Sequence, residues 1–427
     1  MKRRHVLTGA AALAVGTVLL RPRDHSAGYT PYFDGLNRYL RRQGPGHPLL
    51  LIDQHRLVHN CTALLALLPK DRALRIVAKS LPSIGLLDQV MRLTATRKVM
   101  VFHQPFMTAL VTQRPDSDLL LGKPMPVNAA AQFYRQLPAN SPFEPAQQLQ
   151  WLIDSEARLS QYLDLARQLR RRLRINIEID IGLRRGGLDT IEHLDALLDI
   201  INSNPDHLQF SGFMGYDAHV GKQPALVESA ETSYQRSQDR YQAFIDRLYA
   251  HSPQYRDQTL TFNGAGSATV AFHDDNTVLN DLAAGSCLVK PSDFDVPGLA
   301  DFQPAAFIAA PVLKQAEGLD LPGPLPLGKI WSLWNPNRRQ TWFIYGGFWK
   351  ATPVAPEGIS ANALYGASSN QMMFNGSNQL HLSVDDHLFL RPHQSEAVLL
   401  EFGDLAVWDG AQIQQRWPVL TDPTTGA

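Results

Sequence analysis

Short apolar runs alternate with helical stretches over residues 75–290, and this alternation constrains the fold more than any other feature of the chain. Segments between the runs place apolar residues at three- to four-residue spacing, as in Ser155–Leu173 and Ile191–Ile201. Strands that alternate with helices predict a parallel β/α architecture. Eight repeats fit a (β/α)₈ barrel of about 250 residues better than an open sheet. The candidate strands are Arg75–Lys79, Lys98–Phe102, Asp118–Gly122, Leu149–Ile153, Ile175–Ile181, Leu208–Met214, Thr259–Asn263 and Cys287–Lys290.

Beyond Pro311 the sequence changes to Pro/Gly clusters and aromatic-rich, strand-like segments, with no long helical pattern. We therefore predict an α/β barrel over residues 45–304, followed by an antiparallel β domain over residues 305–427. Asp409-Gly410 suits the turn of a hairpin between Asp404–Trp408 and Ala411–Pro418. Leu49–Asp53 precedes the first barrel helix and could pair into the β domain. The other candidate strands of this domain are Lys329–Trp334, Thr341–Trp349, Gln379–Val384 and His387–Leu390.

The first 28 residues have the layout of a signal peptide or signal anchor. Arg3-Arg4 precedes the uncharged apolar run Val6–Leu20, which is short for a membrane span of about 20 residues. The arginine pair followed by apolar residues resembles a twin-arginine (Tat) export signal. We expect a protein that is exported to the periplasm or held on the outer face of a membrane by an uncleaved anchor.

The composition excludes several classes of protein. Equal numbers of basic and acidic residues, 40 of each, argue against a nucleic-acid partner bound by phosphate neutralisation. A hydrophobic content of 44% excludes global disorder. Cys61 and Cys287 are the two cysteines, too few for a disulfide-rich scaffold or a zinc ribbon.

Polar residues that suit chemistry follow the candidate strands, where a (β/α)₈ barrel builds its active site. They are Lys79, Arg185, Tyr216, His219 and the turn made of Asn263, Gly264, Ala265, Gly266 and Ser267. The glycines would let backbone N–H groups approach an anion closely, and Ser267 would add a hydroxyl donor. The alternative is a tight turn with no ligand. A phosphate cradle and a lysine at one rim suggest pyridoxal 5′-phosphate (PLP), whose aldehyde reacts with a lysine amine.

Eight segments resemble, in order, motifs of the fold-type III PLP-dependent enzymes, which have an alanine racemase-type N-terminal barrel. The closest resemblance is to the branch of D-threonine aldolase and eukaryotic-type D-serine dehydratase. The segments are Leu49–Asp53, Ala78–Ser80, Ile177–Gly187, Gly212–His219, Asn263–Thr269, Leu282–Ser286, Tyr345–Lys350 and Phe402–Pro418.

The resemblance implies a role for each matching residue. Lys79 would hold PLP as an internal aldimine and act as the base that removes the substrate Cα proton. The substrate would then pass through a quinonoid carbanion. Arg185 would hydrogen-bond the phenolic oxygen of the cofactor ring. Tyr216 and His219 would face the substrate or the cofactor and take part in catalysis. The family also implies a small amino-acid substrate and a homodimer.

The metal site of this branch is altered. His393 matches its first ligand, but Ser395 stands where the branch has Cys or Asp, and a neutral hydroxyl is a poor ligand for zinc. Glu396 would point to the opposite face if the strand continued. The change argues against tightly bound zinc or manganese, so His219 or His393 would have to move the proton at the substrate β-hydroxyl.

The residues leave three functions open. The first is a PLP-dependent lyase for D-β-hydroxy amino acids, of the aldolase or dehydratase type. The second is a PLP-dependent racemase, which needs an acid/base on the opposite cofactor face, and no tyrosine in the sequence clearly matches that place. The third is a non-catalytic PLP-binding protein. Ser395 would favour this reading, and so would Val77 and Leu81, the apolar residues that flank Lys79.

Overall fold

The computed structural model describes residues 21–222, 224, 226–318 and 327–421. These residues form two compact units, and the larger comprises Gln54–Ala305, residues 394–405 and the segment from Arg416 onward. The smaller unit comprises the chain up to Asp53, Ala306–His393 and Ala406–Gln415. The apolar run of the predicted export signal lies outside the described residues. Among the helices that are described, none is long and apolar enough to span a membrane.

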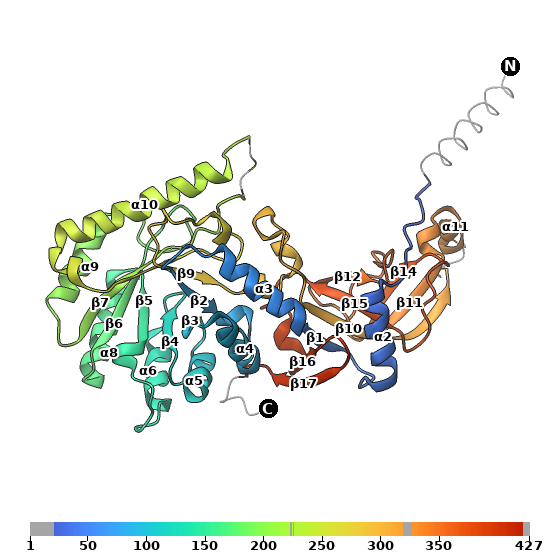
Figure 1. The fold of residues 1–427 in the computed structure, drawn as a ribbon, viewed down its shortest axis with the longest axis horizontal. Coiled ribbons are helices and arrows are strands. Elements are labelled where there is room, and N and C mark those ends of the chain that lie inside the picture. Colours follow the sequence, from blue (N-terminus) through green and yellow to red (C-terminus); the bar gives the residue numbers. More distant parts are fainter. Residues whose placement is uncertain (1–20, 223, 225, 319–326, 422–427) are drawn as a thin grey trace, which may run out of the picture. The chain divides into compact units, whose positions relative to one another are not determined.

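The larger unit is a closed barrel of eight parallel strands, as the sequence predicts. Helices lie outside the ring of strands (Figure 1). The strands are β2 (Ala73–Val77), β3 (Lys98–Val101), β4 (Asp118–Leu121), β5 (Leu149–Ile153), β6 (Leu173–Glu178), β7 (Leu208–Met214), β8 (Thr261–Gly264) and β9 (Asp281–Ala284). The helices are α3 (Gln54–Leu67), α4 (Ile84–Thr94), α5 (Gln104–Gln113), α6 (Val127–Gln136), α7 (Pro145–Gln148), α8 (Glu156–Leu169), α9 (His193–Asn202) and α10 (Ala230–His251).

Local sequence explains where these helices begin and end. The hydroxyl of Ser155 accepts a hydrogen bond from the N–H of Arg158 and caps the start of α8. The helix ends where Arg170 adopts a left-handed conformation, with φ of 51°. The predicted periodicity is confirmed, because Leu159, Leu163 and Ala166 are buried.

Seven of the predicted barrel strands are confirmed to within a few residues, but the eighth is wrong. Cys287–Lys290 is not a strand; Ser286–Leu288 forms a 3₁₀ turn, and β9 is Asp281–Ala284. The hydroxyl of Ser267 accepts from the N–H groups of Gly285 and Cys287, which draws these donors away from a strand ladder. The segment Asp-Leu-Ala-Ala has low β propensity, so its composition does not predict β9.

A buried ionic network ties the strands together inside the barrel. Arg75 on β2 is fully buried and donates to both carboxylate oxygens of Asp281 on β9, at 2.8 and 2.9 Å. Its other guanidinium nitrogen donates to Oδ1 of Asp118 on β4 at 2.9 Å. Lys98 on β3 donates to Asp281 at 3.0 Å. Every charge in this network has a partner of opposite sign, as burial requires.

The smaller unit is built on an antiparallel sheet, and the prediction that Leu49–Asp53 pairs into it is confirmed. This strand, β1, pairs with the long strand β10 (Ala306–Glu317). Helix α2 (Pro31–Gln43) buries Phe33, Leu36 and Leu40 in the core of this unit. The remaining strands are β11 (Gln340–Tyr345), β12 (Ala351–Ala355), β13 (Ser360–Ala361), β14 (Gln371–Gly376), β15 (His387–Pro392), β16 (Asp404–Trp408) and β17 (Ile413–Pro418).

The hairpin around Asp409-Gly410 is confirmed as β16 and β17, with Gly410 at φ of 95°. Two other expectations are wrong. The segment from Lys329 to Trp334 belongs to helix α11 (Leu327–Trp334), because a short apolar run fits either structure and only its surroundings decide. Residues 379–384 form no strand. The strand that precedes them in the sequence, β14, pairs with β11 in the sheet.

Candidate active site

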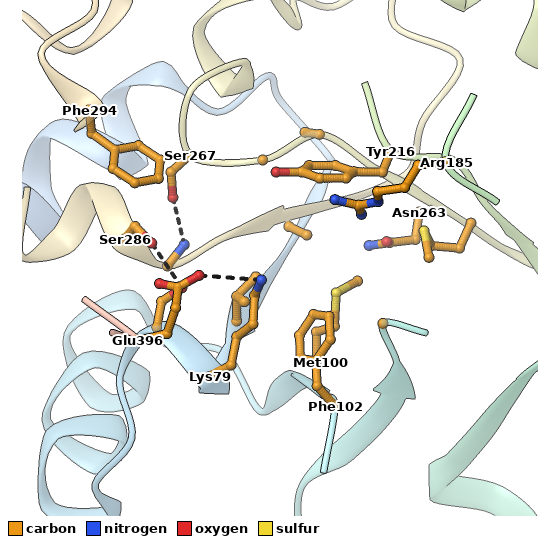
Figure 2. A pocket seen from close by; sticks show the side chains of 18 residues that line it. Lys79, Met100, Phe102, Arg185, Tyr216, Asn263, Ser267, Ser286, Phe294 and Glu396 are labelled. Atoms are coloured by element: carbon orange, nitrogen blue, oxygen red, sulfur yellow. Dashed lines mark hydrogen bonds and ion pairs between the residues drawn. The ribbon is translucent and has the colours of Figure 1, made fainter. Parts of the chain in front are cut away.

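A pocket opens at the carboxyl ends of the barrel strands, and Figure 2 shows its lining. It contains about 610 Å³ of empty space, part of it open to solvent. The structure brings Lys79, Arg185 and Tyr216 together there with most of the predicted turn, since Asn263, Ala265, Gly266 and Ser267 also line the pocket. The lining residues that sequence reasoning missed include Met100, Phe102, Ser286, Phe294 and Glu396.

Lys79 presents its amine to this pocket from a 3₁₀ turn (Ala78–Ser80) directly after β2. Its side chain is 46% exposed, so the amine is accessible to a small molecule. Nζ lies 3.4 Å from Oε1 of Glu396 and 4.8 Å from the centroid of the Phe102 ring (Figure 2). The amine is therefore held by one carboxylate and one aromatic face.

Glu396 lies beside Lys79, and the expectation that it would point away is wrong. That expectation assumed a continuing strand, but β15 ends at Pro392 and the chain turns before Glu396. The hydroxyl of Ser395 donates to Oε2 of Glu396 at 3.1 Å. Ser395 is fully buried and lies 3.3 Å from the hydroxyl of Ser286.

The turn after β8 forms a cradle for an anion. Ala265 adopts the left-handed conformation, with φ of 65°, and Gly266 follows it. The backbone N–H groups of Gly266, Ser267 and Ala268 have no acceptor among the described residues. Successive free N–H groups after a left-handed residue are a common anion-binding arrangement. A side chain at Gly266 would fill the space, because its Cβ would lie 2.7 Å from the Tyr216 ring.

Ser267 adds a side-chain donor to the cradle. Its hydroxyl accepts from the N–H of Gly285 at 3.0 Å and from the N–H of Cys287 at 3.1 Å. These bonds occupy both lone pairs of the oxygen, so its hydrogen is left to donate. Ser267 is the residue that the sequence singled out as a hydroxyl donor.

Arg185 and Tyr216 form a flat wall of the pocket (Figure 2). The guanidinium of Arg185 lies 5.0 Å from the centroid of the Tyr216 ring. Burial, together with the charges of Asp217 and Glu396, raises the pKa of Tyr216 against the opposing effect of Arg185. The phenol therefore stays protonated at neutral pH and can donate a hydrogen bond.

Glu178, at the end of β6, is a titratable group near Arg185. Burial and the charges of Asp154 and Asp180 raise its pKa to about 7, against the opposing effect of Arg185. The unfolded state releases this proton at lower pH than the folded state does, so stability is lost as pH rises from about 4.5 to 7.

We expect Glu178→Gln to raise the free energy of unfolding at pH 8 by about 1–2 kcal/mol and to leave it unchanged at pH 4. Urea unfolding of both proteins at the two pH values measures this difference, and equal values at pH 8 would contradict it.

His219 does not line the pocket that contains Lys79. It lies in a second depression with Asp180, Arg236 and Arg240. Its Nε2 is 3.2 Å from the hydroxyl of Ser237, and burial lowers its pKa. Its role in catalysis stays a prediction.

His393 contacts Thr352, with Nε2 2.7 Å from the threonine hydroxyl. Across the part of the chain that the structure describes, no three His, Cys, Asp or Glu side chains are grouped to hold a metal ion. Cys61 and Cys287 are both buried free thiols.

The residues of the pocket fit PLP on three counts. The accessible amine of Lys79 suits its aldehyde, and the free N–H groups of Gly266 and Ser267 suit its phosphate. The wall of Tyr216 and Arg185 suits its ring. Asn263 leaves its buried Oδ1 without a hydrogen-bond partner in the described structure, although its amide nitrogen donates to Asp281.

The fold and site define a (β/α)₈-barrel protein with an anion cradle and an accessible lysine at the strand ends. Residues 52–293 match the family model described as "Alanine racemase, N-terminal domain". The match covers more than half of the chain, so the protein belongs to this family, and the resemblance to the fold-type III PLP-dependent enzymes is confirmed.

Solved structures support the same fold at low sequence identity. D-threonine aldolase from Filomicrobium marinum is 16% identical with a TM-score of 0.67, covering 88% of this chain and 97% of its own. D-threo-3-hydroxyaspartate dehydratase from Delftia sp. HT23 is 14% identical with a TM-score of 0.66, covering 87% and 97%. Alanine racemase from Clostridium difficile 630 is 14% identical with a TM-score of 0.64, covering 86% and 97%. A search of curated protein sequences found no match.

Proposed function

We propose that this chain is a PLP-dependent lyase that acts on D-β-hydroxy amino acids, by aldol cleavage or by elimination of water. The observation that carries the proposal is the accessible amine of Lys79 in one pocket with the free N–H groups of the cradle. Membership of the alanine racemase N-terminal domain family supports the cofactor. The lyase branch rests on the motif resemblance and on two of the structural neighbours.

Each pocket residue has a role in this proposal. Lys79 would attach the cofactor and then hold or release a proton at the substrate Cα. Gly264 would keep the turn narrow, and the N–H groups of Gly266 and Ser267 would bind the phosphate. When bound, PLP would supply the electron sink for negative charge at the substrate Cα. Arg185 and Tyr216 would orient the ring.

Substrate assays with single enantiomers test the function. Purified protein supplied with PLP should convert D-threonine to glycine and acetaldehyde, or D-serine to pyruvate and ammonia, and should leave the L enantiomers unchanged. Interconversion of D- and L-amino acids without cleavage would instead identify a racemase. Binding of PLP without either reaction would identify a non-catalytic protein.

The cradle gives a further prediction. Gly266→Ala would place a methyl group 2.7 Å from the Tyr216 ring, so the ring or the turn must shift. We expect the Kd for PLP to rise at least tenfold, which corresponds to about 1.4 kcal/mol. Gly35→Ala is the matched control, because a Cβ there meets no atom within 4 Å. Titration of PLP by fluorescence measures both, and equal affinity in the two variants would contradict the cradle.

We also propose that the chain is exported by the Tat route, because a folded, cofactor-loaded protein suits that pathway and Arg3-Arg4 fits its signal. We expect the double substitution Arg3→Lys/Arg4→Lys to retain the protein in the cytoplasm. Cell fractionation and immunoblotting measure its location. Unchanged export of the double variant would favour a different signal or an anchor.

A further inference from the structure

The proposed reaction needs a group that transfers a proton at the substrate β-hydroxyl, in addition to the base at Cα. Among the described residues that line the pocket, Glu396 carries the only carboxylate. Neither His219 nor His393, the residues that the sequence favoured for this task, lines the pocket. The position of Glu396 therefore makes it the candidate for proton transfer at the substrate β-hydroxyl.

The surroundings of Glu396 orient its two oxygens differently. Ser395 donates to Oε2, which leaves Oε1 facing Nζ of Lys79 at 3.4 Å (Figure 2). Ser395 in turn lies 3.3 Å from Ser286, whose hydroxyl donates to that of Ser80 at 2.9 Å. These three serines are buried. The buried hydroxyl of Ser395 thus holds Oε2 of the carboxylate, while Oε1 stays next to the amine.

We propose that Lys79 and Glu396 form a proton relay between the substrate Cα and its β-hydroxyl, and that this relay takes over the task for which related lyases use a metal ion. The inference rests on the proposed PLP-dependent function.

The proton balance closes for elimination of water. The Cα–H bond breaks, and the proton moves to Nζ of Lys79; PLP, when bound, would supply the sink for the electron pair. The proton passes to Oε1 of Glu396, which donates it to the hydroxyl as the Cβ–O bond breaks and water leaves. The Cα–Cβ double bond takes the electron pair, and both side chains return to their starting state.

For aldol cleavage the same relay runs in the opposite direction. Oε1 of Glu396 accepts the hydroxyl proton as the Cα–Cβ bond breaks and the aldehyde leaves. The proton passes to Nζ of Lys79 and then to Cα. The relay therefore serves both lyase reactions and needs no other proton donor.

Glu396→Gln tests the relay, because the amide keeps the shape and loses the ability to carry the proton. In PLP-loaded protein we expect product formation from D-threonine or D-serine to fall by about 100-fold or more, the usual contribution of a general acid–base group. We expect exchange of the Cα proton with D₂O, followed by NMR on D-serine or on glycine, the product of D-threonine cleavage, to stay within about tenfold of wild type, because Lys79 still performs it. Glu144→Gln, an exposed position on the barrel unit, is the control and should change neither rate.

A second readout does not depend on the cofactor. Without PLP, the carboxylate of Glu396 holds the amine of Lys79 in an ion pair, and loss of the carboxylate releases the amine to react. We expect acetylation of Lys79 by acetic anhydride, followed by mass spectrometry, to be about two- to fivefold faster in Glu396→Gln, as loss of one partly exposed ion pair predicts. If Glu396→Gln does not fold, Glu396→Asp, which withdraws the carboxylate by one methylene, should show a smaller loss of product formation with exchange again retained.

The outcomes separate the two proposals. Cofactor bound at Lys79 with unchanged product formation in Glu396→Gln would overturn the relay alone. An equal fall in exchange and product formation would also overturn it, because Glu396 would then only position Lys79. Wild-type protein that carries no cofactor at Lys79 would overturn the proposed function and the relay together.

Discussion

Lys79→Ala is expected to abolish covalent binding of PLP and to lower lyase activity by at least about 10³-fold. The variant removes both the amine that attaches the cofactor and the proton acceptor at the substrate Cα, and each type of contribution is large. The absorbance band of the bound cofactor at about 410–430 nm should disappear from the purified variant. Spectra and initial rates of variant and wild type measure the two effects.

Two control variants separate this loss from a loss of the fold. Lys350→Ala changes an exposed lysine of the smaller unit and should keep the band and the activity. Lys79→Arg keeps the positive charge beside Glu396 and should fold, but should not attach PLP covalently. A band that persists in Lys79→Ala would show that another lysine holds the cofactor.

Arg75→Ala is expected to destabilise the barrel by about 3–5 kcal/mol, because it leaves the buried carboxylate of Asp281 without its main partner. Burial alone would raise the pKa of Asp281, but the charges and hydrogen bonds of Arg75 and Lys98 outweigh it and lower that pKa. The wild-type stability from Asp281 is therefore present above the unfolded-state pKa of about 4 and is lost as pH falls further. Urea unfolding at pH 7 measures the loss.

Arg97→Ala is the matched control for Arg75. Its side chain is 72% exposed and pairs with the exposed Asp116, so we expect a loss of less than about 1 kcal/mol. The double variant Arg75→Ala/Asp281→Asn removes the uncompensated charge and should recover part of the loss. Equal destabilisation by Arg75→Ala and Arg97→Ala would contradict the ionic network.

The sequence predicts the barrel well because its strands and helices differ in the spacing of their apolar residues and alternate along the chain. Lys79, Arg185, Tyr216 and the turn around Gly266 were predictable for the same reason, since each follows a strand and strand ends of a parallel barrel share one rim. The sequence does not predict β9, whose small residues have low β propensity.

Contacts between distant segments were not predictable. Glu396 follows a strand, and only the turn after Pro392 brings its side chain next to Lys79. Arg75 and Asp281 pair across neighbouring strands whose adjacency follows from barrel closure. His219 follows β7 as expected, but its side chain lies in a different depression from Lys79. Side-chain direction in a loop depends on packing that the spacing of residues does not encode.

Borohydride reduction of the PLP-loaded wild-type protein, followed by peptide mapping, tests the central claim most directly. Reduction makes the attachment of the cofactor permanent, so mass spectrometry can identify the lysine that carries it. We predict a single modified peptide that contains Lys79. Modification of another lysine, such as the buried Lys290, or no modified peptide at all, would contradict the assignment of this pocket as a PLP site.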